Sequence, residues 1–255
     1  FMVAAVILVL VCALGAGTAF AMYIDSVNQK LNRGNMSQKE IDEINDALKP
    51  ASGAVQKGTT FDEPFYMLLI GSDRRSDGSV EGARSDTNIV VRVDPDRNQV
   101  TMVSIPRDTM VELEGYGTNK FNAALNFGGA GLVIKEAEKL LGIDISHYAE
   151  VNFDDLVDLV EAVGGVDVEV SETIDDADAD RTRSDYYNAD IVIEEGLQHL
   201  NGEQALVFAR SRAYLDGDFT RTANQRKLIE AIVEKVLKLN VTELPGVIQA
   251  ATQQK

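Results

Sequence analysis

The sequence predicts an α/β protein: a three-layer α-β-α domain with a mixed central sheet, preceded by an N-terminal transmembrane helix. Short apolar runs typical of buried strands alternate with longer segments of helical periodicity. Hydrophobic residues make up 45% of the 255 positions, which is enough for a sizeable core. An uncharged apolar run comes first, so we expect an anchor at 1–24, a polar stalk at 25–60 and a domain at 61–255.

The apolar run at residues 2–24 contains no charged side chain. About 20 apolar residues cross the hydrocarbon layer of a bilayer as a helix, so we expect a single-pass anchor in the cell membrane. A cleaved signal peptide is the alternative, because Ala19 and Ala21 are spaced as at a small-residue cleavage site. The run is longer than the roughly 7–15 apolar residues of a signal peptide, which favours the anchor.

The expected elements follow the chain in order. Ser37 and Glu40 form a capping-box pattern, which opens a short helix in the stalk. The nearly continuous apolar run at 65–71 predicts a buried central strand. Residues 87–95 and 98–106 alternate apolar with polar side chains around a turn-rich connector, and they predict a hairpin. The other expected elements are a helix at 37–48, a helix at 122–142, a strand at 147–153, a helix at 154–165, a strand at 166–170, and helices at 201–212 and 222–239.

The acidic segment 171–190 breaks this alternation and is expected to be a solvated, exposed loop. Asp176, Asp178 and Asp180 resemble the first ligands of an EF-hand loop. The glycine and the closing glutamate of that motif are absent from the sequence, so we expect no calcium site here.

Composition argues against several classes of function. The chain has 24 Lys and Arg against 41 Asp and Glu, a net charge of -17, which opposes nonspecific nucleic-acid binding. Its one cysteine, Cys12, lies in the apolar run, so the domain has no disulfide and no catalytic thiol. The two histidines, His147 and His199, are too few and too far apart to predict a zinc site.

Arginine and aspartate gather where the expected strands end. Asp73 follows the first strand, Asp86 opens the second, and Arg107 follows the third. Guanidinium groups bind phosphate oxygens directly, whereas carboxylates approach phosphate only through a divalent cation such as Mg²⁺. The prediction is a metal pair, Asp73 and Asp86, and a phosphate clamp, Arg107, Arg210, Arg212 and Arg221. The alternative is mutual neutralisation of neighbouring Asp–Arg pairs, which at a surface contributes about 0–1 kcal/mol.

The stretch 208–226 carries four arginines in an otherwise acidic chain. One expected helix ends at the first two of them, and a glycine turn follows. Arg221 and Gln225 are four residues apart, so they share one face at the start of the next helix. That helix N-terminus favours an anion. Arg226 points away from this face and is expected to be a surface charge.

Several short motifs occur in order between about residues 65 and 239. They are GSD, RSDT, SIPRD, NKFNAA, LNGEQAL, ARSR and GDFTRTANQR. With these motifs the chain resembles the LytR-CpsA-Psr family, whose members are membrane-anchored enzymes with an extracellular domain. The resemblance implies an Mg²⁺-dependent phosphotransferase with a lipid-tail pocket. The expected donor is a glycopolymer on a polyprenyl-pyrophosphate carrier, and the expected acceptor is a peptidoglycan hydroxyl that becomes part of a phosphodiester.

The resemblance also implies roles for single residues. Asp73 and Asp86 match the metal-associated aspartates, and Asp73 is our hypothesis for the catalytic base. Arg107 is expected to be catalytic as well as phosphate-binding. The residues expected to bind the pyrophosphate are Arg107, Arg210, Arg212, Arg221, Gln225 and Lys120, the last lying near the phosphates or the acceptor. Leu125 stands where an aromatic residue is usual in the family, and a further C-terminal stretch is expected in full-length members.

Two other classes of function stay open at this point. A noncatalytic binder, scaffold or regulatory protein for polyprenyl pyrophosphate would use the same arginines. The Asp73/Asp86 pair favours catalysis, because a binder needs no metal-aligned leaving group. Direct transcriptional regulation is disfavoured by the acidic charge, by the lack of a DNA-binding helix pair and by the expected anchor.

Overall fold

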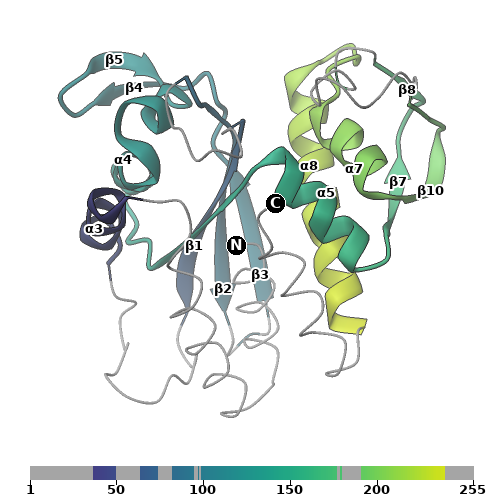
Figure 1. The fold of residues 1–255 in the computed structure, drawn as a ribbon, viewed down its shortest axis with the longest axis horizontal. Helices are drawn as coiled ribbons and strands as arrows, with labels where there is room; N and C mark the ends of the chain where they lie inside the picture. The colour runs from purple at the N-terminus through teal and green to yellow at the C-terminus, as the bar shows by residue number, and fades with distance from the viewer. Residues whose placement is uncertain are drawn as a thin grey trace. The chain divides into compact units, whose positions relative to one another are not determined.

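A computed structural model of the chain shows two compact units, divided between Asn152 and Phe153 (Figure 1). The first unit consists of residues 1–152 and 252–255, and the second of residues 153–251. The structure describes residues 37–49, 64–73, 82–94, 97, 99–176, 179 and 191–238. The expected anchor at 1–24 and most of the stalk lie outside these residues. Among the described residues no helix has the length and apolar character needed to cross a membrane.

A four-stranded mixed sheet organises the first unit. Its strands are β1 (Phe65–Ser72), β2 (Ser85–Asp94), β3 (Gln99–Ser104) and β6 (His147–Val151), in the spatial order β3-β2-β1-β6. β2 runs antiparallel to both β1 and β3, whereas β6 is parallel to β1. The mixed sheet and the β2–β3 hairpin are therefore confirmed, as is the buried strand β1, six of whose eight residues are buried.

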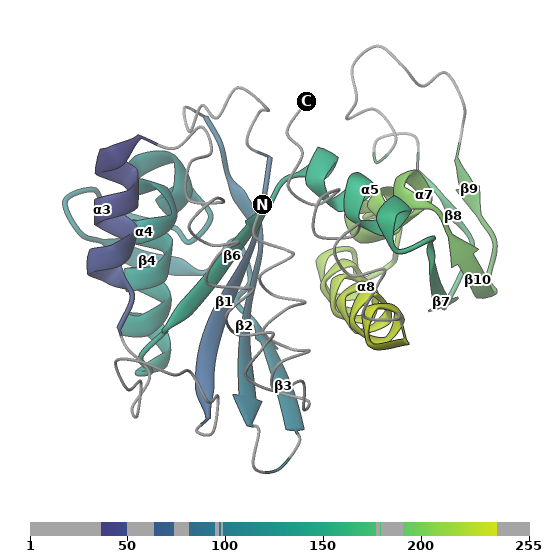
Figure 2. The same cartoon turned by 60° about the horizontal axis from the view of Figure 1, so that its bottom comes forward.

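Two helices pack on one face of this sheet. They are α3 (Gln38–Ala47) and α4 (Ala123–Leu141), which lie side by side in both ribbon views (Figures 1 and 2). The Ser37 side chain accepts a hydrogen bond from the backbone N–H of Glu40 at 3.3 Å, which confirms the predicted start of α3. The core between helices and sheet includes Ile44 of α3, Leu68 and Ile70 of β1, Val90 of β2, and Phe121, Leu125 and Val133 from the α4 region.

Helix α4 covers the predicted segment 122–142 but is broken near its start. Gly128 and Gly129 have non-helical backbone angles, and Gly129 has φ of 60° with ψ of -165°. Only glycine adopts that combination without strain, because it has no Cβ. The consecutive glycines therefore set off one helical turn, which ends at Phe127, from the rest of α4.

A short hairpin precedes α4 and was not expected from the sequence. It pairs β4 (Met110–Leu113) with β5 (Gly117–Lys120) in antiparallel register. Each strand has four residues, which is too short for an apolar–polar alternation to stand out. The hairpin joins the end of the β3 segment to the start of α4.

In the second unit, the elements that the structure describes are helices and two small ladders. Its elements are α5 (Phe153–Ala162), β7 (Val166–Val170), β8 (Ile174–Asp175), β9 (Val192–Ile193), β10 (Gly196–Leu200), α7 (Gly202–Arg210) and α8 (Asp218–Lys238). β7 pairs with β10 and β8 pairs with β9, both antiparallel, so β7 does not join the four-stranded sheet in the described part of the chain. Helix α8 begins at Asp218, four residues before the expected start at residue 222.

The start of α7 is fixed by three polar contacts. Asn201 and Gln204 form a capping box, in which each side chain accepts a hydrogen bond from the other residue's backbone N–H. The Gly202 N–H donates to Glu161 of α5 at 2.8 Å. A Cβ on Gly202 would lie 2.5 Å from the Val157 carbonyl oxygen, so only glycine allows α7 to approach α5 this closely. These contacts set the position at which α7 ends, where the arginines begin.

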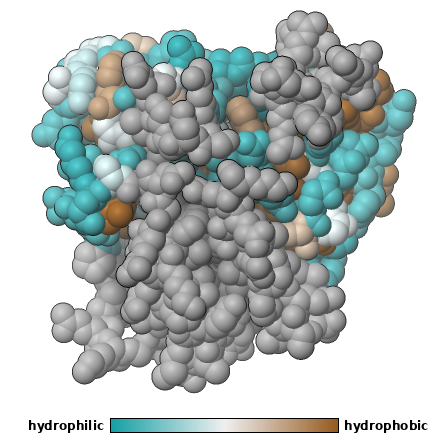
Figure 3. Space-filling model, in the orientation of Figure 1, coloured by the Kyte–Doolittle hydropathy of each residue, from teal (hydrophilic) through white to brown (hydrophobic). Residues whose placement is uncertain are grey.

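The described surface visible in Figure 3 is largely hydrophilic, with scattered apolar residues. This agrees with the charged composition and with the scattered exposed hydrophobic side chains of the first unit, such as Val103, Met110 and Leu140.

Candidate active site: a charged row and an arginine segment

The two predicted metal ligands lie at the same end of the β1–β2 ladder. Ser72 pairs with Ser85 after a register shift, which places Asp73 and Asp86 beside that pair. Asp73 is bound to Arg84 in both directions: its N–H donates to the Arg84 carbonyl oxygen at 3.2 Å, and its carboxylate accepts from the Arg84 N–H. These backbone contacts fix the position of the Asp73 side chain.

A glycine allows this end of the ladder to close. Gly71 lies opposite Thr87, and a Cβ added to Gly71 would lie 2.7 Å from the Thr87 Cβ. Real Cβ atoms do not approach so closely, so a larger residue would push the two strands apart. The threonine of RSDT therefore requires the glycine of GSD opposite it.

Four side chains of alternating charge extend from Asp86 along the surface of the first unit. Arg107 Nη1 lies 3.1 Å from Asp86 Oδ1, and Arg107 Nε lies 3.6 Å from Asp108 Oδ2. Lys120 Nζ in turn lies 2.6 Å from Asp108 Oδ1. We call Asp86, Arg107, Asp108 and Lys120 the charged row. Three of the predicted site residues thus meet in one connected group.

Asn122 holds the charged row together and was missed in the sequence. Its side-chain amide donates to Asp86 Oδ1 at 3.4 Å. Its backbone N–H donates to the Arg107 carbonyl oxygen at 3.1 Å, and its own carbonyl accepts from the Ser85 N–H at 3.3 Å. Asn122 belongs to the NKFNAA motif and lies at the N-cap of α4, but its side chain makes no cap hydrogen bond, so neither position indicated this role.

The donor set at this ladder end fits a magnesium ion that is completed by its substrate. Mg²⁺ in phosphoryl-transfer sites uses one or two carboxylates and keeps its other positions for phosphate oxygens and water. Asp73 and Asp86 supply that number. Among the described residues no group of three or more His, Cys, Asp or Glu side chains could enclose a metal by itself. A cation here would therefore depend on phosphate oxygens for its remaining ligands.

The second unit holds the other predicted residues, at the end of α7 and the start of α8. The Arg210 guanidinium lies 4.2 Å from the centre of the Phe153 ring, a cation–π contact. Arg221, whose side chain is only 4% exposed, lies with Nη2 2.6 Å from Asp218 Oδ1. Gln225 donates to the Ala209 carbonyl oxygen at 3.1 Å and so ties α8 to the end of α7.

Asp176 fixes the second arginine of this segment, contrary to the expectation of a solvated loop. Its Oδ2 accepts from Ser211 Oγ at 2.8 Å and from the Arg212 N–H at 2.9 Å. Asp176 is half-buried and follows β8, so it is part of the folded unit. Its partners lie 35 and 36 residues away, which no local pattern shows.

Tyr214 and Asn224 bridge the turn between α7 and α8. The buried Asn224 side chain donates to the Tyr214 hydroxyl oxygen at 2.8 Å. Burial raises the pKa of Tyr214 to about 12, so its phenol stays neutral at physiological pH. The bridge therefore orders this turn without adding negative charge beside the arginines.

Neither histidine lies in these groups. His147 begins β6, packs against the Phe65 ring, and has its pKa lowered by burial. His199 lies on β10, 2.7 Å from Asp167 on the neighbouring strand β7. Their low priority as catalytic residues is consistent with these positions.

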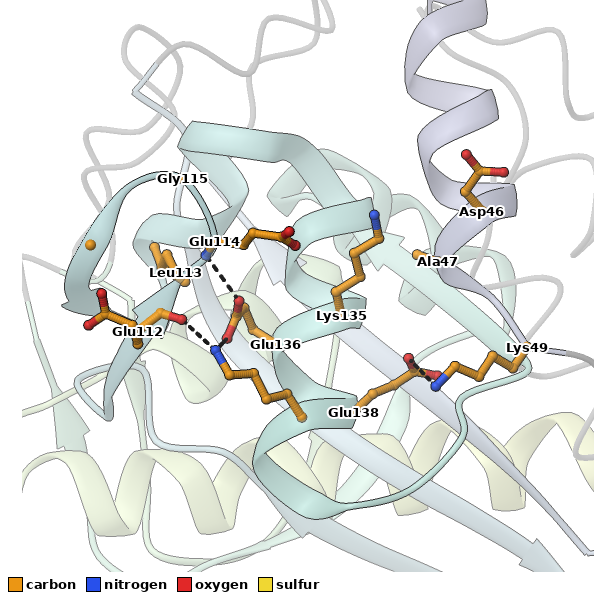
Figure 4. Close-up of a pocket in the computed structure, with 12 residues that line it drawn as sticks. Asp46, Ala47, Lys49, Glu112, Leu113, Glu114, Gly115, Lys135, Glu136 and Glu138 are labelled. Atoms are coloured by element: carbon orange, nitrogen blue, oxygen red, sulfur yellow. Dashed lines mark hydrogen bonds and ion pairs between the residues drawn. The ribbon is translucent and has the colours of Figure 1, made fainter.

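A polar pocket of about 660 Å³ lies between α3, α4 and the β4–β5 hairpin (Figure 4). Five carboxylates and three lysines line it, a balance that disfavours a pyrophosphate. The buried Glu138 lies 3.1 Å from Lys49, and the buried Glu136 lies 3.5 Å from Lys139. Lys139 also donates to the Glu112 carbonyl oxygen at 2.7 Å. These contacts tie the hairpin and the end of α3 to α4, which is a structural role.

The mixed α/β fold places carboxylates and arginines at strand and helix ends, where guanidinium groups can bind phosphate directly and carboxylates can do so through a divalent cation. The model of the LytR_cpsA_psr family matches residues 20–254 of the sequence, so the chain belongs to this family.

Named relatives agree with this assignment. The chain is 45% identical over 181 residues to the polyisoprenyl-teichoic acid–peptidoglycan teichoic acid transferase TagU of Enterococcus faecalis. That alignment covers 70% of this chain and 55% of the relative, so the chain spans little more than half of that protein.

Solved structures share the fold. The crystal structure of Bacillus subtilis TagV has 32% sequence identity and a TM-score of 0.64, over 76% of this chain and 74% of that one. The structure of TagT bound to LIIa-WTA has 27% identity and a TM-score of 0.60, over 81% and 82%. The mixed α/β fold with its central mixed sheet is therefore that of known family members.

Proposed function

We propose that the chain is a phosphotransferase that moves a glycopolymer from a polyprenyl-pyrophosphate carrier to a hydroxyl of peptidoglycan. One observation carries the proposal: Asp86 and Arg107, held by Asn122, stand beside Asp73 at one end of the sheet. The end of the sheet thus carries two carboxylates of the kind that bind Mg²⁺ and a guanidinium of the kind that binds phosphate. The names of the TagU relative and of the TagT complex support this substrate class.

The proposed reaction is one phosphoryl transfer. The acceptor oxygen forms a bond to the phosphorus that bears the glycopolymer, and the phosphoanhydride bond breaks. Polyprenyl phosphate leaves with the bonding electron pair, and the product is a phosphodiester. Asp73 takes the proton from the attacking hydroxyl, because the Arg84 backbone fixes its carboxylate at the end of β1.

Arginines bind the charge that the reaction redistributes. Such reactions depend mainly on positioning and on charge stabilisation. Arg107 would contact the transferred phosphoryl group from the first unit. The other residues that we propose for pyrophosphate binding belong to the second unit: Arg210, Arg212, Arg221 and Gln225. Lys120, at the far end of the charged row, would contact the phosphates or the acceptor.

Magnesium is the proposed cofactor, with Asp73 and Asp86 as its protein ligands. When bound, it would neutralise negative charge on the pyrophosphate oxygens and so favour departure of polyprenyl phosphate. Asp86 also contacts Arg107, which would keep the guanidinium beside the same phosphate.

The proposal includes a membrane anchor at residues 2–24 and an extracellular domain. The uncharged run supports the anchor, since it has the length of a membrane helix. We also propose the three-layer arrangement, with helices on both faces of the sheet. Its support is that β1 and β2 are buried on both faces, with Met67 and Leu68 at 1% and 0% exposure and Ile89 and Val90 at 0% and 4%.

Release of polyprenyl phosphate tests this function. The purified chain would be given a polyprenyl-pyrophosphate-linked disaccharide and solubilised peptidoglycan fragments, with Mg²⁺ or with EDTA. We expect release and phosphodiester formation with Mg²⁺, and at least hundredfold slower release with EDTA. Tight donor binding without release under any condition would instead identify a lipid-pyrophosphate binding protein.

A further inference from the structure

Two exposed aromatic rings stack on each other in the first unit, one from the tip of the β4–β5 hairpin and one from the first turn of α4. The ring centres of Tyr116 and Phe127 lie 4.8 Å apart, and the ring planes differ by 14°. Tyr116 is 48% exposed and Phe127 is 38% exposed. Neither the core nor the proposed phosphoryl transfer requires them. We call these two side chains the aromatic pair.

The pair is rigid before any ligand arrives. The Tyr116 hydroxyl donates to the Phe127 carbonyl oxygen at 3.0 Å, and Asn119 donates to the Tyr116 carbonyl at 2.9 Å. Gly115 and Gly117, on either side of Tyr116, both have positive φ and shape the hairpin tip. Since the rings are held in place, a ligand that covers them would cause little loss of side-chain entropy.

The pair is connected to the catalytic end of the sheet by short segments. Phe127 lies five residues after Asn122, and about 1.5 Å of rise per residue places it roughly 7–8 Å further along α4. Asn126, next to Phe127, accepts a hydrogen bond from the Gly82 N–H at 2.6 Å, two residues before Arg84. The β4–β5 hairpin starts and ends beside Asp108 and Lys120 of the charged row.

The size and surroundings of the pair fit a sugar ring. Two partly exposed rings offer far less apolar area than the roughly 1,000 Å² that a specific protein interface needs. A pyranose has one face of C–H groups, which packs on an aromatic ring, and a rim of hydroxyls that require polar partners. Thr118, Asn119 and Glu112 supply polar groups on the same hairpin.

We propose that the aromatic pair binds a sugar unit of the acceptor glycan and so places its hydroxyl beside the charged row. This inference rests on the proposed function, since it assigns the acceptor's position in that reaction. The donor enters through its pyrophosphate, whereas a neutral glycan chain offers little for arginines to recognise. The aromatic pair lies within about the length of a disaccharide from Asn122, and it offers a surface on which a neutral sugar ring can stack.

The burial of Leu125 shows why Phe127, and not position 125, is assigned to sugar binding. Leu125 is fully buried in the core, so an aromatic ring at that position would not face a substrate. The lack of an aromatic residue at position 125 therefore does not remove a ring from the surface, and Phe127 still exposes one.

Two readouts test the proposal on the full chain. The first is saturation-transfer difference NMR with a tetramer of β-1,4-linked N-acetylglucosamine, which carries no phosphate. The second is the acceptor KM for solubilised peptidoglycan fragments in the polyprenyl phosphate assay. The variants are Tyr116→Ala, Phe127→Ala and Phe127→Leu, with Tyr116→Phe and Leu140→Ala as controls. Tyr116→Phe keeps the ring, and Leu140 is an exposed leucine near the other end of α4.

We expect each loss of a ring to raise the acceptor KM about three- to tenfold, the range of a single aromatic contact. The value of kcat should stay within about twofold. Saturation transfer to the sugar should fall in the same variants and persist in Leu140→Ala. In Tyr116→Phe it should fall at most partly, because this variant keeps the ring but loses the hydrogen bond to the Phe127 carbonyl oxygen. Phe127→Leu keeps apolar volume at that site, so its loss of binding would report the ring itself.

An unchanged acceptor KM together with unchanged saturation transfer in the ring-deleted variants would overturn the inference. If the wild-type chain released no polyprenyl phosphate, the proposed function would fail. Binding of the tetramer would still be decided by NMR in that case, so the two failures are distinguishable.

Discussion

The two units present their charges in different ways. In the first, the charged row alternates in sign and lies near the surface, with the Arg107 side chain 20% and the Lys120 side chain 58% exposed. In the second, the segment 205–227 has five Lys and Arg against two Asp, and the Arg221 side chain is only 4% exposed. One region is balanced and accessible, and the other is cationic with a buried Arg221 side chain.

This difference suggests a division of labour. A balanced row attracts a pyrophosphate weakly until a divalent cation joins its carboxylates, so its residues should affect the chemical step most. A cationic segment attracts an anion directly, so its residues should affect donor affinity most. The predictions below separate these two effects.

Loss of a carboxylate from the first unit should have the largest effect. We expect Asp86→Asn and Asp73→Ala to slow polyprenyl phosphate release at least hundredfold, because each removes a metal ligand and Asp73 is also the proposed base. Donor binding should change less than about threefold. The measurement is single-turnover release beside equilibrium donor binding.

Asp94→Asn is the matched control for Asp86→Asn, since Asp94 ends the same strand and pairs with Arg92 at 2.8 Å. It should lower the melting temperature but leave the rate of release near the wild-type value. Turnover at the wild-type rate in Asp73→Ala would remove that residue from the catalytic set.

The second unit should show the opposite balance. We expect Arg221→Lys to weaken donor binding about ten- to hundredfold, because lysine cannot replace the bidentate donors of a guanidinium. The rate of release at saturating donor should fall less. Isothermal titration with polyprenyl-pyrophosphate-linked disaccharide measures the first effect. Arg226→Lys, one turn further along α8, should change the affinity less than about twofold, and a large loss there would contradict its assignment as a surface charge.

Local patterns were sufficient for most of the fold. The Ser37 cap, the β2–β3 hairpin and the start of α7 all depend on residues close in sequence, so their signals were readable. The hairpin β4–β5 and the strands β8 and β9 were missed, because strands of two to four residues carry too few positions for a period to show. The five-residue strand β10 was missed as well, although β7, its partner of equal length, was expected at 166–170.

The charged residues of the candidate site were predictable from the sequence, but the residues that hold them in position were not. Aspartates and arginines at strand ends can be recognised in the sequence as possible metal-binding and phosphate-binding residues. Asn122 and Asp176 act through partners about 35 residues away, Asp86 for one and Ser211 for the other. Only the folded backbone brings such pairs together, so no spacing rule could have selected them.

Asp176 tests whether a residue that only holds Ser211 and the Arg212 backbone in position affects donor binding. We expect Asp176→Ala to weaken donor binding about three- to tenfold, because Ser211 and the Arg212 N–H lose their acceptor. An unsatisfied donor costs about 1–3 kcal/mol, so the melting temperature should fall by several degrees. Asp175→Ala, at the exposed neighbouring position, is the control and should change neither. Unchanged affinity in a destabilised Asp176→Ala protein would limit Asp176 to a structural role.

The smallest expected effect concerns a charge pair in the second unit that lies outside the arginine segment. A hydrogen bond from His199 lowers the pKa of Asp167 below its ordinary value of 3.8, and the nearby charges of Lys235 and Lys238 act in the same direction. A carboxyl group with a lowered pKa in the folded state stabilises the fold above about pH 4, and this contribution disappears as the pH falls through the lowered pKa. Because the pair is exposed, Asp167→Asn should lower the melting temperature by only about one degree at pH 5. The difference in melting temperature should disappear as the pH falls through the lowered pKa of Asp167, and donor affinity should be equal throughout. A gap that stayed constant down to acidic pH would show that the Asp167 charge contributes nothing, and any loss of donor affinity would extend the binding surface of the second unit to this ladder.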